Sequence, residues 1–385
     1  MKNAAAIAYI RELCALGLTG ELLIPALLEA LHRVIPSARN LFDWVNADGS
    51  ISRYYFEGPI DPDLARLYFE EFHNKREAEA MPRYVDVIHS SATIRSAEEL
   101  NHQRFFDSAL YSEIWRPQRL HYRLEAIVRG RHGRAIGSLV LYREKGDGIF
   151  SRADEETLAT LVPYVAHGLQ QSSAEPVDFA SAGSRAVLVN LDAQARIVHL
   201  SRYAYKVLLL AHGDISPAAA ARAPASEDFP TLGLLHRQIA RAPGPGPEAP
   251  CTLTLNNAWG RFDFRAERLS AVSGAGPALT GITIEHLVPR EVRDLDALAG
   301  SALSITQQKV CAMLLRGWSQ ARIAAHLGVS ATTVTDHVRK IYRKLDLHSA
   351  DELRARFARA PGTPARTASS LSQNPGMPGA TGRNR

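Results

Sequence analysis

The feature that most constrains this 385-residue chain is the division of residues 331–345 into an apolar side and a polar side. If the segment is an α-helix, at about 100° per residue, Val338, Ile341 and Leu345 lie within about 40° of Val334 and form one narrow apolar stripe with it. The opposite side has no large apolar residue and holds Thr332, Thr335, Asp336, Arg339, Lys340 and Arg343. Such a helix buries its stripe on a small module and leaves its other side for water or a polar partner.

The flanking segments have the pattern of three further short helices. Residues 306–316 carry apolar residues at helical spacing. Start and stop signals bound the helices: Ser319, Ser330 and Ser349 as N-caps, Gly317 and Gly328 as C-terminal glycines, and Glu352 in a capping box with Ser349. Two short helices joined by residues 327–330 make a helix-turn-helix, so residues 301–359 are expected to form an all-α domain of four helices.

Residues 303–353 resemble the LuxR-type (GerE) helix-turn-helix of transcription regulators. The matching residues keep the family's order without a gap: Val310, Gly317, Ser319, Ile323, Ala324, Leu327, Val329, Ser330, Thr333, Val334, His337, Ile341, Lys344, Leu345, Glu352 and Leu353. Two positions depart from the family pattern. Gln307 stands where Glu is usual, and Thr335 stands where Lys is usual. These departures bear on DNA affinity and sequence preference more than on the fold.

The resemblance implies that the third helix, residues 331–345, enters the major groove of DNA. It assigns the reading of bases to Thr335, Asp336 and Arg339. It assigns contact with the DNA backbone to Ser319, Gln320, Arg322, Thr332, Thr333, His337, Lys340, Arg343 and Lys344. The family often makes its dimer contact through the fourth helix, here residues 350–359.

Several of these assignments have plainer alternatives, which the sequence leaves open. Arg339 can contact a phosphate instead of a base. Thr332 and Thr333 can cap the helix together with Ser330, and His337 can simply cover the surface of the module. The module as a whole can also bind a protein instead of DNA.

Charge is distributed unevenly along the chain. The net charge is +5, and residues 300–360 hold ten Lys and Arg against four Asp and Glu, while the tail beyond residue 360 adds three arginines. Residues 1–299 are therefore net negative. A basic C-terminal module on an acidic body indicates where a polyanion would bind, although basic faces are often merely solvated.

Residues 1–299 have the pattern of two mixed α/β, sensor-like domains, so the expected fold class is α+β, with these two domains ahead of the helix-turn-helix domain. The expected boundaries are 1–170 and 185–288 for the two domains, 171–184 and 289–300 for linkers, 301–359 for the helix-turn-helix domain, and 360–385 for a disordered tail. The tail is rich in Pro, Gly, Ser and Thr and almost lacks large apolar residues.

Periodicity predicts the elements of both domains. In the first we expect a helix over 20–35, hairpins of 41–46 with 51–56 and of 120–128 with 136–142, and a helix capped by Ser151 and bent at Pro163. In the second we expect strands at 186–190, 196–200, 251–255, 261–269 and 280–286, a helix from Arg202 and a helix near 232–240.

The two domains also resemble known sensor domains. Residues 1–170 are similar to a GAF domain in element order and in residues 134–142 and 150–155. Residues 185–288 are similar to a PAS domain in residues 187–192 and 281–285. The resemblance implies control of the helix-turn-helix domain by a small-molecule effector, whose identity the sequence does not reveal.

Neither sensor-like domain shows a cofactor motif or a metal site. The histidines at positions 73, 89, 102, 121 and 199 are not paired at metal-binding spacing. Phe105, Phe106 and Trp115 fit an apolar core better than a ligand-binding box. The arginines around the second hairpin fit a solvated face more readily than an anion-binding site: Arg116, Arg119, Arg123, Arg129, Arg131 and Arg134. No GxGxxG, GxxxxGK, GxSxG or HExxH motif is present, which disfavours an enzyme.

The expected function is therefore a dimeric, sequence-specific DNA-binding transcription regulator. Its expected partners are double-stranded DNA, RNA polymerase, a small-molecule effector and a second copy of the chain. No membrane is expected, because no apolar run approaches the roughly 18 residues of a span. Three widely spaced cysteines and the lack of a signal-peptide pattern favour the cytoplasm.

Two alternatives use a similar C-terminal domain. A sigma-factor-like subunit also reads DNA with a four-helix helix-turn-helix, but it needs basic, aromatic promoter-melting helices, and residues 1–299 are acidic. An autoinducer receptor has one larger ligand domain with Trp, Tyr and Asp-Pro-Trp pocket markers. Those markers are not recognisable here, and such a receptor leaves residues 184–288 unexplained.

Overall fold

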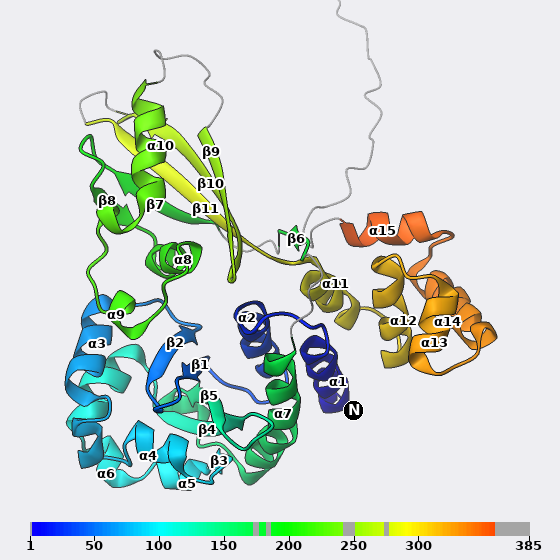
Figure 1. Cartoon of the computed structure of the whole chain (residues 1–385), viewed down its shortest axis with the longest axis horizontal. Helices are drawn as coiled ribbons and strands as arrows, with labels where there is room; N and C mark the ends of the chain where they lie inside the picture. The colour runs from blue at the N-terminus through cyan, green and yellow to red at the C-terminus, as the bar shows by residue number, and fades with distance from the viewer. Residues whose placement is uncertain (1, 172–176, 182–185, 242–250, 273–276, 359–385) are drawn as a thin grey trace, which may run out of the picture.

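The computed structural model describes residues 2–171, 177–181, 186–241, 251–272 and 277–358. Two antiparallel sheets with their helices precede a helical C-terminal domain (Figure 1). This arrangement confirms the expected mixed α/β region followed by an all-α module. The tail, residues 360–385, lies outside the described residues.

The first sheet has the strand order β2-β1-β5-β4-β3. Its strands are β1 (Arg39–Val45), β2 (Ile51–Phe56), β3 (Ile94–Arg95), β4 (Tyr122–Arg129) and β5 (Ala135–Arg143). Both expected hairpins are present, as β1 with β2 and β4 with β5, and β1 pairs with β5 to join them.

Three helices cover one face of this sheet: α1 (Lys2–Cys14), α2 (Gly20–Leu31) and α7 (Arg152–Gln170). Alternate strand residues point to opposite faces, so Phe42, Leu124 and Leu139 are buried under these helices. The capping box that opens α7 is confirmed, with Asp154 Oδ2 accepting from Ser151 N at 2.8 Å. Helix α2 ends earlier than expected, at Leu31.

A long excursion between β2 and β4 covers the other face. It contains α3 (Pro62–Leu67), α4 (Tyr84–His89), α5 (Ala97–Leu100), α6 (Gln103–Phe106) and short π and 3-10 turns over Tyr68–Phe72, Arg76–Glu79, Tyr111–Trp115 and Arg116–Gln118. Arg123 differs from the expected solvated face, since it is only 4% exposed. The reason is its register on β4, which turns its side chain toward the excursion instead of toward water.

The second sheet has the order β8-β7-β11-β10-β9, with all of these pairs antiparallel. Its strands are β7 (Val187–Leu191), β8 (Ile197–Leu200), β9 (Cys251–Asn257), β10 (Gly260–Leu269) and β11 (Leu279–Pro289). Helices α8 (Ala204–Ala211) and α10 (Pro230–Arg241) pack on it, and the short α9 (Pro217–Ala220) contacts α3. The expected alternation in β10 is confirmed, because Phe262 and Phe264 are buried and Arg265 is exposed.

The two expected linkers contain regular structure where the model describes them. Residues 290–299 form α11 (Arg290–Ala299), which buries Val292, Leu295 and Leu298. These apolar residues recur every third position, so they form one helix face although charged residues separate them. Farther upstream, β6 (Phe179–Ala180) pairs with Val288 and Pro289 at the end of β11. Residues 172–176 and 182–185 lie outside the described ranges.

Helix α11 connects the first domain with the C-terminal helices (Figure 1). Asp296 accepts hydrogen bonds from Tyr9 at 2.7 Å and from Arg33 at 2.8 Å. On the other side, Arg293 donates to the carbonyl oxygen of Phe357 at 2.7 Å. The three cysteines are free thiols. Among the helices that the model describes, none is long and apolar enough to cross a membrane.

Candidate nucleic-acid interface

Residues 305–358 fold into four helices in the described part of the chain: α12 (Ile305–Leu315), α13 (Gln320–Leu327), α14 (Ala331–Leu345) and α15 (Ala350–Ala358). Their shared core contains Val310, Cys311, Ile323, Val334 and Ile341. Burial raises the pKa of Cys311 to about 12, so its thiol stays protonated inside this core. The sequence-based expectation of four helices is confirmed, with bounds shifted by about one residue at α12.

Capping hydrogen bonds explain where these helices begin. The hydroxyl of Ser319 accepts from Arg322 N at 3.2 Å, and that of Ser330 accepts from Thr333 N at 3.1 Å. Between α13 and α14, Gly328 adopts φ 64°, a left-handed conformation that favours glycine. At α15, Glu352 accepts from His348 N and not from Ser349 N, so the expected capping box forms only in part.

The amphipathic division of α14 is confirmed. Its stripe is buried, with exposures between 0% and 8% for Val334, Val338, Ile341 and Leu345. The opposite face is exposed along its length and presents Thr332, Asp336, Arg339, Lys340 and Arg343. The helix therefore packs on its own domain through one side only.

Two of the expected base-reading residues lie side by side on this face. The Arg339 side chain is 78% exposed and that of Asp336 is 56% exposed, with 3.7 Å between Arg339 Nη1 and Asp336 Oδ1. This is a long, solvated contact between residues three apart on one helix. Such contacts contribute only a few tenths of a kcal/mol, about 0.2–0.5, so both side chains are free to reorient toward a ligand.

The third expected base reader, Thr335, is partly engaged within the domain. Its hydroxyl lies 2.9 Å from Gln320 Oε1 on α13 and 3.0 Å from the Ala331 carbonyl oxygen. The contact joins the first residue of α13 to the first turns of α14. Thr335 and Gln320 thus link the two helices of the helix-turn-helix.

Lys344, expected at the DNA backbone, points toward the N-terminus of α12. Its ammonium donates to the Ala302 carbonyl oxygen at 3.1 Å and to Gln307 Oε1 at 3.0 Å. Gln307 is only 6% exposed and also accepts from Ser304 N at 3.0 Å, which forms a capping box that sequence reasoning did not identify. The Ser-x-x-Gln spacing of residues 304–307 was the available signal.

The remaining expected contacts surround the N-termini of α13 and α14. Arg322 is exposed and stacks 4.0 Å over the ring of Trp318. The hydroxyl of Thr333 lies 2.8 Å from that of Ser330, in keeping with the capping alternative. Nδ1 of His337 is buried and has no hydrogen-bond partner among the described residues. Within the same residues, no three His, Cys, Asp or Glu side chains gather as metal ligands would.

Comparisons with known proteins agree with this geometry for one part of the chain. A search of curated proteins found no match. Among solved structures, the phage VqmA–DPO complex is similar at 20% identity, over 45% of this chain and 81% of that chain, with a TM-score of 0.20. The Vibrio cholera VqmA–ligand–DNA complex is similar at 15% identity, over 44% and 81%, with a TM-score of 0.21.

A third structure, the E. coli DhaR(N)–DhaL complex, is similar at 12% identity, over 72% of this chain and 86% of that chain, with a TM-score of 0.23. Similarities at such low TM-scores assign nothing to this chain. The family model of "Bacterial regulatory proteins, luxR family" matches residues 301–356. With the exposed α14 face and the glycine turn before it, residues 301–356 form a luxR-type helix-turn-helix domain.

Proposed function

We propose that this chain is a sequence-specific DNA-binding transcription regulator. The observation that carries the proposal is the exposed polar and basic face of α14, which lies opposite the apolar stripe that is buried in its own domain. A recognition helix needs this division, because one face must hold the helix rigidly while the other enters the major groove. A transcription regulator of this kind works where the DNA lies, in the cytoplasm, together with RNA polymerase.

We assign base reading to Asp336 and Arg339, supported by their exposed side chains, which make only a long contact with each other. Thr335 is proposed as a third reader that also positions α14 through Gln320. Backbone contact is proposed for the exposed residues at the two helix N-termini and along α14: Ser319, Gln320, Arg322, Thr332, Thr333, Lys340 and Arg343. His337, which is partly buried, completes the proposed set. For Lys344, whose ammonium bonds to Ala302 and Gln307 within the domain, we propose a structural role in place of the backbone contact that the resemblance implies.

We propose that the regulator binds as a dimer. A single recognition helix offers few base contacts, so two copies are needed for useful specificity. Helix α15 is the proposed contact between copies. Its polar face is exposed at Asp351, Arg354 and Arg356, while Leu353 and Phe357 hold it to the domain.

Control by the N-terminal region is the last part of the proposal, with residues 1–170 as a GAF-like sensor and residues 185–288 as a PAS-like domain. The contacts around α11 support it, since Asp296 bonds to Tyr9 of α1 and to Arg33 just after α2, while Arg293 bonds to the end of α15. A second contact joins Lys309 of α12 to Glu12 of α1 at 2.6 Å. A change in α1 or α2 therefore has a direct path to the DNA-binding helices.

The proposal is tested by selecting bound sequences from random DNA with the full chain. We expect one enriched motif with two related halves, and a motif relaxed at one base pair per half for Arg339→Ala. Arg241→Ala, on the last turn of α10, is the matched control and should give the motif of the unmodified chain. Recovery of DNA without any enriched motif contradicts sequence-specific binding.

A further inference from the structure

A cavity of about 140 Å³ lies against the first sheet, on the face that the excursion between β2 and β4 covers. Its walls come from strands β1, β2, β4 and β5 and from the excursion, and they include Asp43, Tyr54, Tyr68, Trp115, Arg123 and Tyr142. None of its lining residues belongs to the C-terminal helices, so DNA binding by α14 does not account for it. Most of its walls are aromatic or aliphatic, but several charged groups also face it.

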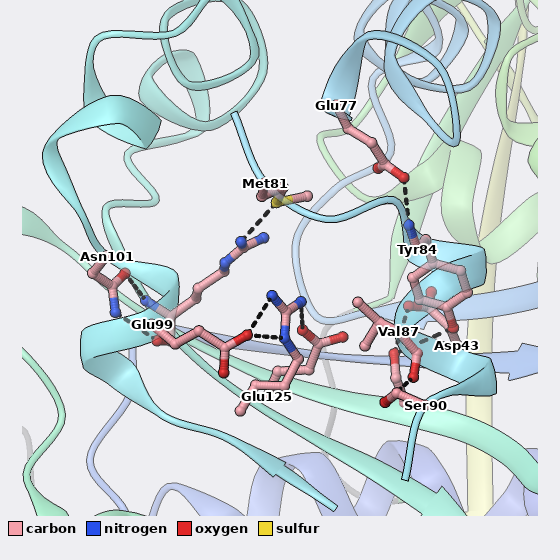
Figure 2. A network of polar contacts seen from close by, with 12 residues as sticks. Asp43, Glu77, Met81, Tyr84, Val87, Ser90, Glu99, Asn101 and Glu125 are labelled. Atoms are coloured by element: carbon pink, nitrogen blue, oxygen red, sulfur yellow. Dashed lines mark hydrogen bonds and ion pairs between the residues drawn. The ribbon is translucent and has the colours of Figure 1, made fainter. Parts of the chain in front are cut away.

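Among the charged groups of the cavity, Arg123 stands out because its guanidinium lacks good hydrogen-bond partners. It is 4% exposed, and its Nε has no hydrogen-bond partner among the described residues. Its Nη2 donates to the thioether sulfur of Met81 at 2.7 Å, and a thioether is a weak acceptor (Figure 2). Arginine is not deprotonated in proteins, so this buried guanidinium carries its charge without a good partner.

The neighbouring Arg95, in contrast, has two carboxylate partners. Its guanidinium pairs with Glu125 at 3.0 Å and with Glu99 at 3.0 Å (Figure 2). Glu125 is therefore already engaged by Arg95. Both arginines line the cavity, but only Arg95 has carboxylate hydrogen-bond partners in the protein.

The unpaired Nε of Arg123 and the weakly paired Nη2 form the edge that binds carboxylates. The N–H groups of Nε and Nη2 lie on one side of a guanidinium and form two parallel hydrogen bonds to the two oxygens of a carboxylate. Met81 is the group that occupies this edge in part, and a methionine side chain adapts its conformation easily. An anionic ligand can therefore take the place of the sulfur contact.

Of the acidic groups that line the cavity, Asp61 caps α3 and Glu125 is paired with Arg95. The other two, Asp43 and Glu77, are shifted toward their neutral forms. Burial raises the pKa of Asp43 to about 8, so its carboxyl group is mostly protonated at neutral pH. Burial also raises the pKa of Glu77, whose Oε1 accepts from Tyr84 N and Asn74 N. The phenols of Tyr54, Tyr68, Tyr84 and Tyr142 stay neutral, since burial raises the pKa of each.

Ring packing and size restrict the rest of the ligand. The rings of Tyr68 and Trp115 lie 6.0 Å apart edge to face, and Tyr54 and Phe69 lie 5.7 Å apart. Such walls favour a flat ring that stacks or meets them edge-on. An apolar protein cavity of roughly 150 Å³ is known to accept benzene, so the volume here suits a single ring.

We propose that this cavity binds a single-ring aromatic carboxylate, with the carboxylate on Nε and Nη2 of Arg123 and the ring against Tyr54, Tyr68 and Trp115. This inference rests on the proposed sensor role of residues 1–170 and specifies the class of its effector. The ring centroids of Phe105 and Trp115 lie 4.9 and 5.6 Å from the guanidinium carbon of Arg123.

The test is calorimetric titration of the full chain, without DNA, with benzoate, phenylacetate and 4-hydroxybenzoate, and with the uncharged amide of each. We expect saturable one-site binding of at least one carboxylate, and binding of the corresponding amide at least about tenfold weaker. Arg123→Met should abolish carboxylate binding, and Arg123→Lys should weaken it at least about tenfold, because Lys lacks the two-pronged edge. The matched control is Arg116→Met, an exposed arginine outside the cavity, which should bind like the unmodified chain.

Folding does not confound this test. Replacing a buried, poorly paired charge by an apolar side chain of similar size is often neutral or stabilising, so Arg123→Met should unfold at the same temperature as the unmodified chain or higher. The inference is overturned if none of the three carboxylates binds, if Arg123→Met binds as tightly as Arg116→Met, or if amide and acid bind equally. Because no DNA is present, such a failure leaves the proposed DNA binding separately testable.

Discussion

Replacing Lys344 with Met should destabilise the C-terminal domain and leave the salt dependence of its DNA binding unchanged. The Lys344 ammonium donates to the Ala302 carbonyl oxygen at 3.1 Å and to Gln307 Oε1 at 3.0 Å, which ties α14 to the N-terminus of α12. Hydrogen bonds from a charged donor contribute about 1.5–3 kcal/mol. Because Lys344 remains exposed and water replaces part of the interaction, we expect a loss of about 1 kcal/mol. Gln307 keeps its bond to Ser304 N, so no buried acceptor is orphaned.

Hydrogen exchange of the full-length protein, followed by mass spectrometry, measures this loss locally. A loss of about 1 kcal/mol accelerates exchange of the α12 and α14 amides about fivefold when exchange follows the opening equilibrium. The matched variant is Lys340→Ala, whose side chain is exposed on the outer face of α14. It should leave exchange unchanged and reduce the slope of log K against log salt concentration by about 0.9. A reduced slope for Lys344→Met, with exchange unchanged, refutes the reasoning and makes Lys344 a phosphate contact.

Three further predictions concern single residues. Arg339→Ala should weaken binding to the preferred site by about 1–3 kcal/mol while sparing random DNA, as titrations of both DNAs will show; equal losses indicate a phosphate contact. Asp336→Asn should raise affinity for random DNA and shrink the ratio of specific to random binding, because a carboxylate repels phosphate but accepts a hydrogen bond from cytosine N4; an unchanged ratio makes Asp336 a bystander. Asp43 has a pKa of about 8 in the folded protein against 3.8 ordinarily, so its share of stability is complete below pH 4 and is lost as pH rises to 8. The free energy of unfolding, measured with urea, should therefore fall by on the order of 3 kcal/mol between pH 5 and 8, and Asp43→Asn should not show this fall. Identical pH profiles for the two proteins contradict a raised pKa.

The sequence was most informative where a local pattern determined the structure. The buried stripe of α14 follows from spacing alone, and Ser330 and Gly328 mark its start because capping is a local interaction. Helix α11 was missed for a related reason. It is only ten residues long, and its three buried apolar side chains stand among charged residues that resemble a linker.

Tertiary partners explain what the sequence could not show. Alternation places Arg123 on one face of β4, but only the excursion between β2 and β4 decides that this face is covered. Likewise, Lys344 matches a family position, yet its partner Ala302 is 42 residues away. Neither contact leaves a mark in the local pattern. Side chains at ordinary positions in a strand or helix thus acquire roles that depend on distant segments.

The claim that two α14 helices read the major groove is tested most directly by methylation interference at a selected binding site. Methyl groups on guanine N7 lie in the major groove and block a helix that enters it. We predict interference at two clusters of guanines separated by about one helical turn, roughly 10 base pairs. In Arg339→Ala, interference at one guanine of each cluster should be lost. Full binding to DNA methylated throughout, or interference confined to a single half-site bound by one copy, would contradict the account.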